Sequence, residues 1–118
     1  MGTFRHNIEV GDPEGEQYVR LDALVDTGAS YTVLPASILR RLGVKVHDRL
    51  PFVLADGRKT EKEIGQTWIR VDQKAVITIV VFGSEDTETL LGAYALEGLR
   101  LGVDPLNKRL VPLVGYLM

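Results

Sequence analysis

Apolar and polar residues alternate along residues 17–25, and this pattern predicts a half-buried β-strand. Val19, Leu21, Ala23 and Val25 form one uniformly apolar set, while the positions between them are mixed. Residues 4–10 alternate more loosely and are followed by GDPEGE, a stretch whose Gly, Pro and Asp content is typical of a turn. We therefore expect residues 4–25 to form a β-hairpin whose second strand ends at Asp26.

The rest of the chain predicts further short strands and two short helices. Ile38, Leu39 and Leu42 have helical spacing, with Pro35 just before the segment and Gly43 just after it. A second short helix is expected over 93–99, after an acidic loop at 84–88. Strands are expected on either side of an Asp-Gly turn at 56–57, at 66–72, at 74–83, and in a terminal hairpin over 101–114. The predicted class is mainly β, in a single domain over residues 1–118.

Composition narrows the function classes. The net charge of −2 gives no basic face of the kind that nucleic acid requires, so no nucleic-acid partner is expected. The longest apolar run, 75–83, is too short to span a membrane, and the N-terminus lacks the apolar core of a signal peptide. We therefore expect a cytoplasmic protein without a membrane partner. His6 and His47 lack metal-like spacing, so they are expected at the surface and no metal site is predicted.

The strand ending at Val25 delivers a carboxylate, Asp26, into a Thr-Gly turn. Asp and Gly are ordinary turn residues, so the triplet alone is weak. However, it lies between the apolar pairs Leu24-Val25 and Val33-Leu34, whereas a turn between exposed strands is normally flanked by polar residues. The context indicates a carboxylate presented from a packed scaffold. Glycine at position 28 would let main-chain N–H groups approach the acid closely.

Two segments together resemble a known family, the retropepsin-like aspartic proteases. They are ALVDTGASYTVL at 23–34 and LLG at 90–92, which leads directly into the predicted helix AYALEGL. The order of strand, DTG turn, strand, flap hairpin, further strands, LLG, helix and terminal strands covers nearly the whole chain. The resemblance implies a mainly β half-barrel with a flap hairpin and one or two short helices, functional as a two-fold homodimer.

The resemblance also implies a function, that of an aspartic endopeptidase acting on extended polypeptide segments. Such an enzyme needs two carboxyl groups, and the chain contains one DTG triplet; Asp56 and Asp104 lie in turns without apolar flanks. A homodimer with an isologous interface would supply Asp26 twice, with a water held between the two carboxyl groups and no cofactor or metal. Carboxyl groups about 3 Å apart in aspartic proteases share one proton, so activity is expected to be best at about pH 4–6.

Residue roles follow from the same resemblance. Catalytic positions are Asp26, Thr27 and Gly28, with Thr27 hydrogen-bonding across the dimer and Gly28 contacting the substrate main chain. Substrate-binding or supporting positions are Leu24, Ala29, Ser30, Val33 and Leu91, with Ala55, Asp56 and Gly57 near the flap tip. These largely apolar positions suggest a preference for hydrophobic side chains around the cut. The apolar ending RLVPLVGYLM is expected to add dimer contacts.

The chain departs from the family pattern at three places. Ser30-Tyr31 stands where retroviral enzymes often carry acidic residues, Tyr94 stands where many cellular relatives have aspartate, and the flap has a single glycine, Gly57. Two other hypotheses therefore stay open. One is a non-catalytic dimeric peptide-binding module of the same fold, against which the intact Asp26 argues. The other is a half-enzyme that works only when docked to another protein, which the mass in solution would distinguish from a self-dimer.

Overall fold

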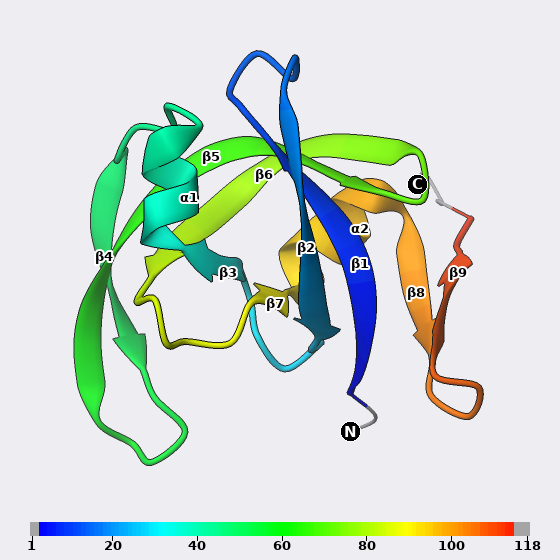
Figure 1. Cartoon of the computed structure of the whole chain (residues 1–118). Coiled ribbons are helices and arrows are strands. Elements are labelled where there is room, and N and C mark those ends of the chain that lie inside the picture. The colour runs from blue at the N-terminus through cyan, green and yellow to red at the C-terminus, as the bar shows by residue number, and fades with distance from the viewer. Residues whose placement is uncertain (1–2, 115–118) are drawn as a thin grey trace, which may run out of the picture.

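The computed structural model describes residues 3–114 of the 118-residue chain and is mainly β. A β-hairpin comes first, and the shorter helix follows the third strand (Figure 1). In chain order the elements are β1 (Phe4–Gly11), β2 (Tyr18–Val25), β3 (Thr32–Pro35), α1 (Ala36–Arg41), β4 (Asp48–Val53), β5 (Lys59–Val71), β6 (Lys74–Gly83), β7 (Leu90–Leu91), α2 (Ala93–Leu99), β8 (Leu101–Asp104) and β9 (Arg109–Pro112).

Seven strands form one sheet that curls back on itself. Its order is β1-β2-β7-β3-β6-β5-β4, and β1 additionally pairs with β5 through Glu9↔Arg70 and Val10↔Ile69. Because β1 pairs on both sides, the sheet closes around an apolar interior, and β4 is left outside this closure as the outer arm of a hairpin with β5. The side chains in the interior are almost completely buried, among them Ile8, Val25, Leu34, Ile69, Leu91 and Leu99.

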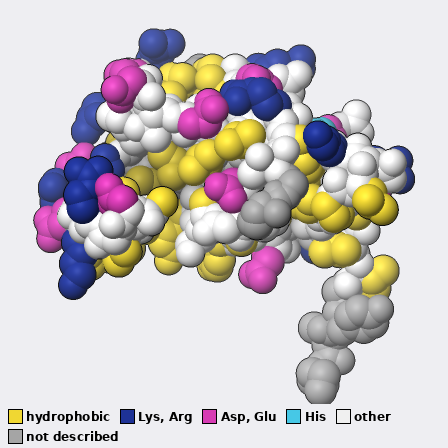
Figure 2. Space-filling view, turned by 90° about the horizontal axis from the view of Figure 1, so that it is seen from below, with side chains coloured by type: hydrophobic (Ala, Val, Ile, Leu, Met, Phe, Trp, Pro, Cys, Tyr) yellow, Lys and Arg dark blue, Asp and Glu magenta, His cyan; other side chains and the backbone are white. Residues whose placement is uncertain are grey.

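The hairpin formed by β4 and β5 and the separate β8–β9 hairpin lie on opposite sides of the molecule (Figure 1). The loop that follows β2 and the tip of the β4–β5 hairpin both lie at the lower edge in that view. Seen from below, charged side chains gather over the β4–β5 hairpin, and apolar side chains occupy much of the surface between the two hairpins (Figure 2). Neither α1 nor α2, the helices between residues 3 and 114, is long and apolar enough to cross a membrane.

Most of the predicted elements are present. The 4–25 hairpin pairs from Phe4↔Val25 to Gly11↔Tyr18, and the helices lie at 36–41 and 93–99. The terminal hairpin is β8–β9, with Asp104 next to the turn. Dimer contacts predicted for the apolar ending fall partly on residues 115–118, which lie outside the described residues.

One predicted boundary is wrong. The return strand of the flap and the strand at 66–72 are a single 13-residue strand, β5. β5 pairs with β4 up to Ile64 and with β6 from Ile64 onward, so it changes partner without a break. Gly65, which favours a boundary in the sequence, instead allows a close chain approach, because a Cβ there would lie 2.5 Å from the carbonyl oxygen of Lys45.

Candidate active site

Asp26 is fixed at the end of β2 by the neighbouring strand β7. The two strands are parallel, with Leu24 opposite Leu90 and Val25 opposite Leu91. The N–H of Asp26 donates to the carbonyl oxygen of Leu91 at 3.0 Å, so the pairing continues into the loop. The carboxylate therefore starts from backbone anchored in the sheet.

The turn that follows wraps around the carboxylate. The N–H of Gly28 donates to Oδ1 of Asp26 at 2.9 Å, and the N–H of Ala29 donates to the carbonyl oxygen of Asp26 at 3.1 Å. A side chain that accepts from the backbone two residues ahead is the usual device of an Asx-turn. It leaves Oδ2 and the second lone pair of Oδ1 available for other partners.

The rest of the loop is held by the start of α2. Ala93 N–H donates to the carbonyl oxygen of Ala29 at 2.8 Å, and Tyr94 N–H donates to that of Ser30 at 3.0 Å. The first N–H groups of a helix have no partner within the helix, and here the loop carbonyls satisfy two of them. Gly92 N–H donates to Oγ1 of the fully buried Thr32 at 3.1 Å.

Gly92 is required at the point where the loop and α2 meet. A Cβ at this position would lie 2.6 Å from the carbonyl carbon of Tyr31 and 2.7 Å from its oxygen, closer than real Cβ atoms approach. Since both neighbours are backbone atoms, neither can move aside by a rotamer change. The LLG motif therefore serves the site through the absence of a side chain as much as through its two leucines.

The carboxylate opens into a cleft of about 490 Å³ between the loop and the β4–β5 hairpin. Six of the residues predicted for the site line this cleft: Asp26, Gly28, Ala29, Ser30, Val33 and Ala55. The other wall comes from β6, β7 and the loop between them, including Val81, Thr87 and Leu90. The fold therefore brings residues from four separate parts of the sequence to one cleft.

The other predicted site residues lie elsewhere. Leu24 is half-buried and does not line the cleft, and Leu91 is fully buried in the core. Asp56 and Gly57 lie at the exposed tip of the β4–β5 hairpin, where Asp56 accepts from the Arg58 side chain at 2.7 Å. None of these four residues lines the cleft in the described part of the chain.

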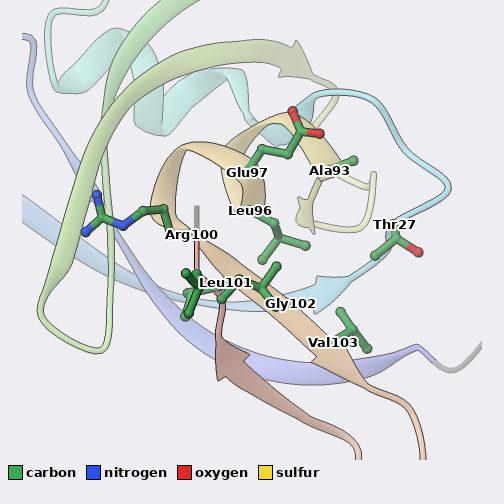
Figure 3. A pocket seen from close by; sticks show the side chains of 10 residues that line it. Thr27, Ala93, Leu96, Glu97, Arg100, Leu101, Gly102 and Val103 are labelled. Atoms are coloured by element: carbon green, nitrogen blue, oxygen red, sulfur yellow. The ribbon is translucent and has the colours of Figure 1, made fainter. Parts of the chain in front are cut away.

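Thr27 lies on a different cavity from Asp26. This second cavity of about 300 Å³ is formed by α2, β8 and the residues after β9. Figure 3 shows the side chains of Thr27, Leu96 and Val103 gathered around it. Its other walls include Leu113 and Val114, which are 53% and 75% exposed. The turn thus directs two successive residues toward two different surfaces.

Sequence reasoning missed several cleft residues. They are Tyr31, Phe52, Leu54, Lys62, Thr87 and Leu90. Tyr31 makes edge-to-face contacts with Phe52, at 6.2 Å between ring centroids, and with Tyr94, at 6.0 Å. Thr60 lies opposite Phe52 and, with Lys62, lines the cleft. The two-residue periodicity of β5 could have indicated that Thr60 and Lys62 share a face, but not which surface that face meets.

The acidic loop at 84–88 is tied to the scaffold by side-chain hydrogen bonds and an ion pair. Glu85 accepts from the N–H of Ser37 at 3.1 Å and from its hydroxyl at 2.6 Å, and Glu88 pairs with Arg5 at 3.0 Å. The hydrogen bonds from the Ser37 hydroxyl and N–H hold the pKa of Glu85 below its ordinary value. These contacts position Thr87 at the cleft wall.

Possible metal ligands do not gather in the part of the chain that the structure describes: residues 3–114 contain no cluster of three or more His, Asp or Glu side chains suited to a metal ion. His6, on β1, instead contacts the carboxylate of Asp72, with 3.1 Å between Nε2 and Oδ2. Among the described residues that line the cleft, the candidate catalytic group is the Asp26 carboxylate.

Comparison with known proteins identifies the family. Residues 16–98, well over half of the chain, match the family described as "gag-polyprotein putative aspartyl protease". The chain belongs to this family. A comparison with curated protein sequences gives no match. The aspartyl protease resemblance inferred from the DTG and LLG motifs is thereby confirmed.

The fold of the aspartyl protease chain agrees with this assignment. It is similar to the solution structure of the Simian Foamy Virus (mac) protease, with a TM-score of 0.58 and 18% sequence identity. The similarity covers 80% of this chain and 92% of the viral one. At this identity the likeness concerns the fold, and it confirms the predicted retropepsin-like class.

Proposed function

We propose that this chain is an aspartic endopeptidase that works as a two-fold homodimer with one Asp26 from each copy. The observation that carries the proposal is the position of Asp26. Among the described residues it is the one carboxylate that lines the cleft, and backbone hydrogen bonds hold it there. Membership of the aspartyl protease family supports peptide hydrolysis. A single carboxylate is insufficient for the shared-proton chemistry of such enzymes.

The cavity at Thr27 supports the self-dimer. It adjoins the turn that carries Asp26 and has apolar walls, with exposed Leu113 and Val114 beside it. Exposed apolar surface next to a half-complete site favours coverage by a partner. A second copy related by a two-fold axis would cover this surface, bring the two Thr27 hydroxyls close together, and place the two carboxyl groups side by side.

In the proposed reaction, one Asp26 carboxylate acts as the general base on a water molecule held between the pair. The water oxygen forms a bond to the scissile carbonyl carbon while its proton passes to the carboxylate. The other Asp26, protonated, donates a hydrogen bond to the carbonyl oxygen and stabilises the tetrahedral intermediate. When the C–N bond breaks, a carboxyl group returns a proton to the leaving amine.

Substrate contacts follow from the cleft walls. Gly28, Ala29, Ser30 and Val33 would contact an extended polypeptide from the loop side. The β4–β5 hairpin, with Ala55 at its cleft edge, would act as the flap that closes over the bound segment and excludes water. Leu24 and Leu91 would support the loop from the core side, and Asp56 and Gly57 would move with the flap tip.

The test is cleavage of a diverse mixture of unfolded peptides between about pH 3 and 7, the range in which a carboxyl pair titrates. Wild type is expected to cut best at about pH 4–6, and Asp26→Asn is expected to lose about 10³-fold or more of the rate. Asp72→Asn is the matched control, since this acid lies in the exposed β5–β6 turn with φ of 51°, a conformation that Asn tolerates.

Subunit mixing tests the shared site. When wild type is mixed with an equal amount of Asp26→Asn, about a quarter of all dimers in the mixture should carry two carboxylates after random exchange, which is half the number that wild type forms alone. The specific activity per wild-type chain should therefore fall by about half, whereas Asp72→Asn should cause no such loss. An absence of cuts at every pH from a folded dimer, or full activity from a monomer at micromolar concentration, would overturn the proposal.

A further inference from the structure

The cleft wall carries a second charge that the proposed reaction does not use. Of the described residues that line the cleft, Asp26 is the one acidic residue and Lys62 the one basic residue. Lys62 lies on β5 in the β4–β5 hairpin, and it is half-buried. The rest of the wall near it is uncharged, with Thr60 on the same strand and Phe52 opposite Thr60 on β4.

Strand geometry separates Lys62 from the acids beside it in sequence. Side chains alternate between the two faces of a strand, so Glu61 and Glu63 lie on the face opposite to that of Lys62. Both are already paired there: Glu61 with Arg49 at 3.5 Å, and Glu63 with Arg40 at 3.1 Å and Arg49 at 3.3 Å. The ammonium on the cleft face therefore has no neutralising neighbour on its own strand.

The acidic loop across the cleft does not neutralise Lys62 either. Glu85 is bonded to Ser37, Glu88 to Arg5, and Asp86 accepts from the Ser84 hydroxyl at 2.9 Å. No ion pair joins Lys62 to any side chain between residues 3 and 114. Within the described protein, the half-buried Lys62 side chain thus lines a cleft whose wall also includes the uncharged residues Val33, Val81 and Gly83.

A positively charged side chain on such a wall favours a ligand of opposite charge, because the apolar side chains around the cleft strengthen the attraction between the two charges. We propose that Lys62 determines specificity by selecting polypeptide segments with an aspartate or glutamate side chain within a few residues of the cleaved bond. The inference rests on the proposed protease function. In a two-fold dimer each half of the cleft would hold one Lys62, so the acidic residue could lie on either side of the cut.

The first experiment maps cuts in the same peptide mixture with wild type, Lys62→Met and Lys62→Glu. Wild-type cuts should be enriched in Asp or Glu at one position on each side, Lys62→Met should lose this enrichment, and Lys62→Glu should replace it with Lys or Arg. Lys59→Glu is the matched control, because Lys59 is exposed on the same strand and does not line the cleft. It should keep the wild-type preference.

Synthetic peptides that differ only by Glu or Gln at the mapped position give the size of the effect. Wild type should prefer the Glu peptide by about tenfold in kcat/KM at low salt, the range of a charge-assisted contact. The preference should shrink at high salt because mobile ions screen the pair. Equal kcat/KM values for the two peptides, or a preference that survives Lys62→Met, would overturn the proposal.

A binding measurement separates this inference from the proposed function. Asp26→Asn, with and without Lys62→Glu, is immobilised and exposed to the peptide mixture, and the retained peptides are sequenced. Acid enrichment that reverses with Lys62→Glu supports the role of Lys62 even if wild type cuts nothing. Retained peptides with no acid enrichment, or no retained peptides at all, overturn it even if wild type is an active protease.

Discussion

The loop at 26–31 and the tip of the β4–β5 hairpin at 54–58 face the same cleft but are held very differently. The loop is bonded to β7 and to the first turn of α2, and Gly92, just before α2, donates to Thr32, just after the loop. The tip closes on itself, through Leu54 N–H to the Arg58 carbonyl at 2.7 Å and Gly57 N–H to that of Leu54 at 2.9 Å, and its side chains are exposed. A segment with few buried contacts opens at low free-energy cost. The molecule thus combines a fixed acid with a cover that can open.

A matched pair of glycine substitutions should separate the two regions most strongly. Gly92→Ala places a methyl group against the Tyr31 backbone, so we expect a loss of about 3 kcal/mol in unfolding free energy and loss of cleavage. Gly57→Ala meets no atom within 4 Å, but its φ of +88° disfavours a side chain, so we expect a loss of about 1 kcal/mol with cleavage retained. Urea unfolding and peptide cleavage measure both variants. Equal effects from the two substitutions would contradict the difference between the regions.

A pair of threonine substitutions tests the hydrogen bond from Gly92. Thr32→Val removes the Oγ1 that accepts from Gly92 N–H and leaves this buried donor unpaired, at a cost of about 1–3 kcal/mol. Thr78 is the control, because its buried Oγ1 has no partner among the described residues. Thr78→Val should be neutral or slightly stabilising in the same urea titration. If Thr78→Val lowers the free energy of unfolding more than Thr32→Val does, the hydrogen bond from Gly92 to Thr32 does not stabilise the fold as expected.

The parts of this arrangement that depend on local pattern could be predicted from the sequence. The alternation of residues 17–25 gave β2, and Pro35 and Gly43 bracketed α1, because each signal lies within one element. Asp26, Gly28 and Val33 were assigned to the site because the family motif is contiguous. The structure brings the two motifs together, with Val25 of β2 opposite Leu91 of β7, a pairing that the sequence did not predict.

The parts that depend on how distant elements face each other could not be predicted. Phe52 and Lys62 reach the cleft only because the β4–β5 hairpin extends beside the loop, and periodicity does not say which side of a hairpin meets it. Gly65 suggests a break, but it lies within one long strand because the Lys45 backbone passes against it. Thr27 and Asp26 are adjacent in sequence, and only the shape of the turn assigns them to different cavities.

Loss of the contact between the β4–β5 hairpin and the 26–31 loop should have a smaller, local effect. Phe52→Ala removes the ring that packs edge-to-face on Tyr31, a contact of about 0.5–1.5 kcal/mol. We expect faster amide hydrogen exchange over residues 48–64, little change over 24–34, and a higher KM. Phe52→Leu, which keeps most of the apolar volume, should show a weaker version of the same changes. Faster exchange across both segments would mean that the hairpin and loop open as one unit.

The smallest expected effect concerns the fixed end of the 84–88 loop and depends on pH. The pKa of Glu85 is lowered by the Ser37 hydroxyl and N–H, so its ionised form stabilises the folded state at pH values above its ordinary 4.5. The stabilisation of the folded state by ionised Glu85 is lost as the pH falls through the lowered pKa that Glu85 has in the folded protein. Wild type should therefore have a slightly higher Tm than Glu85→Gln at about pH 6–7, and the two Tm values should converge only after the pH has fallen below the ordinary pKa of a glutamate. Glu14 has no side-chain bond among residues 3–114, so Glu14→Gln should leave the Tm unchanged across this range. The proposed protease would work at mildly acidic pH. If the two Tm values already converge at pH 5, the Glu85 contact with Ser37 does not hold the 84–88 loop at that working pH.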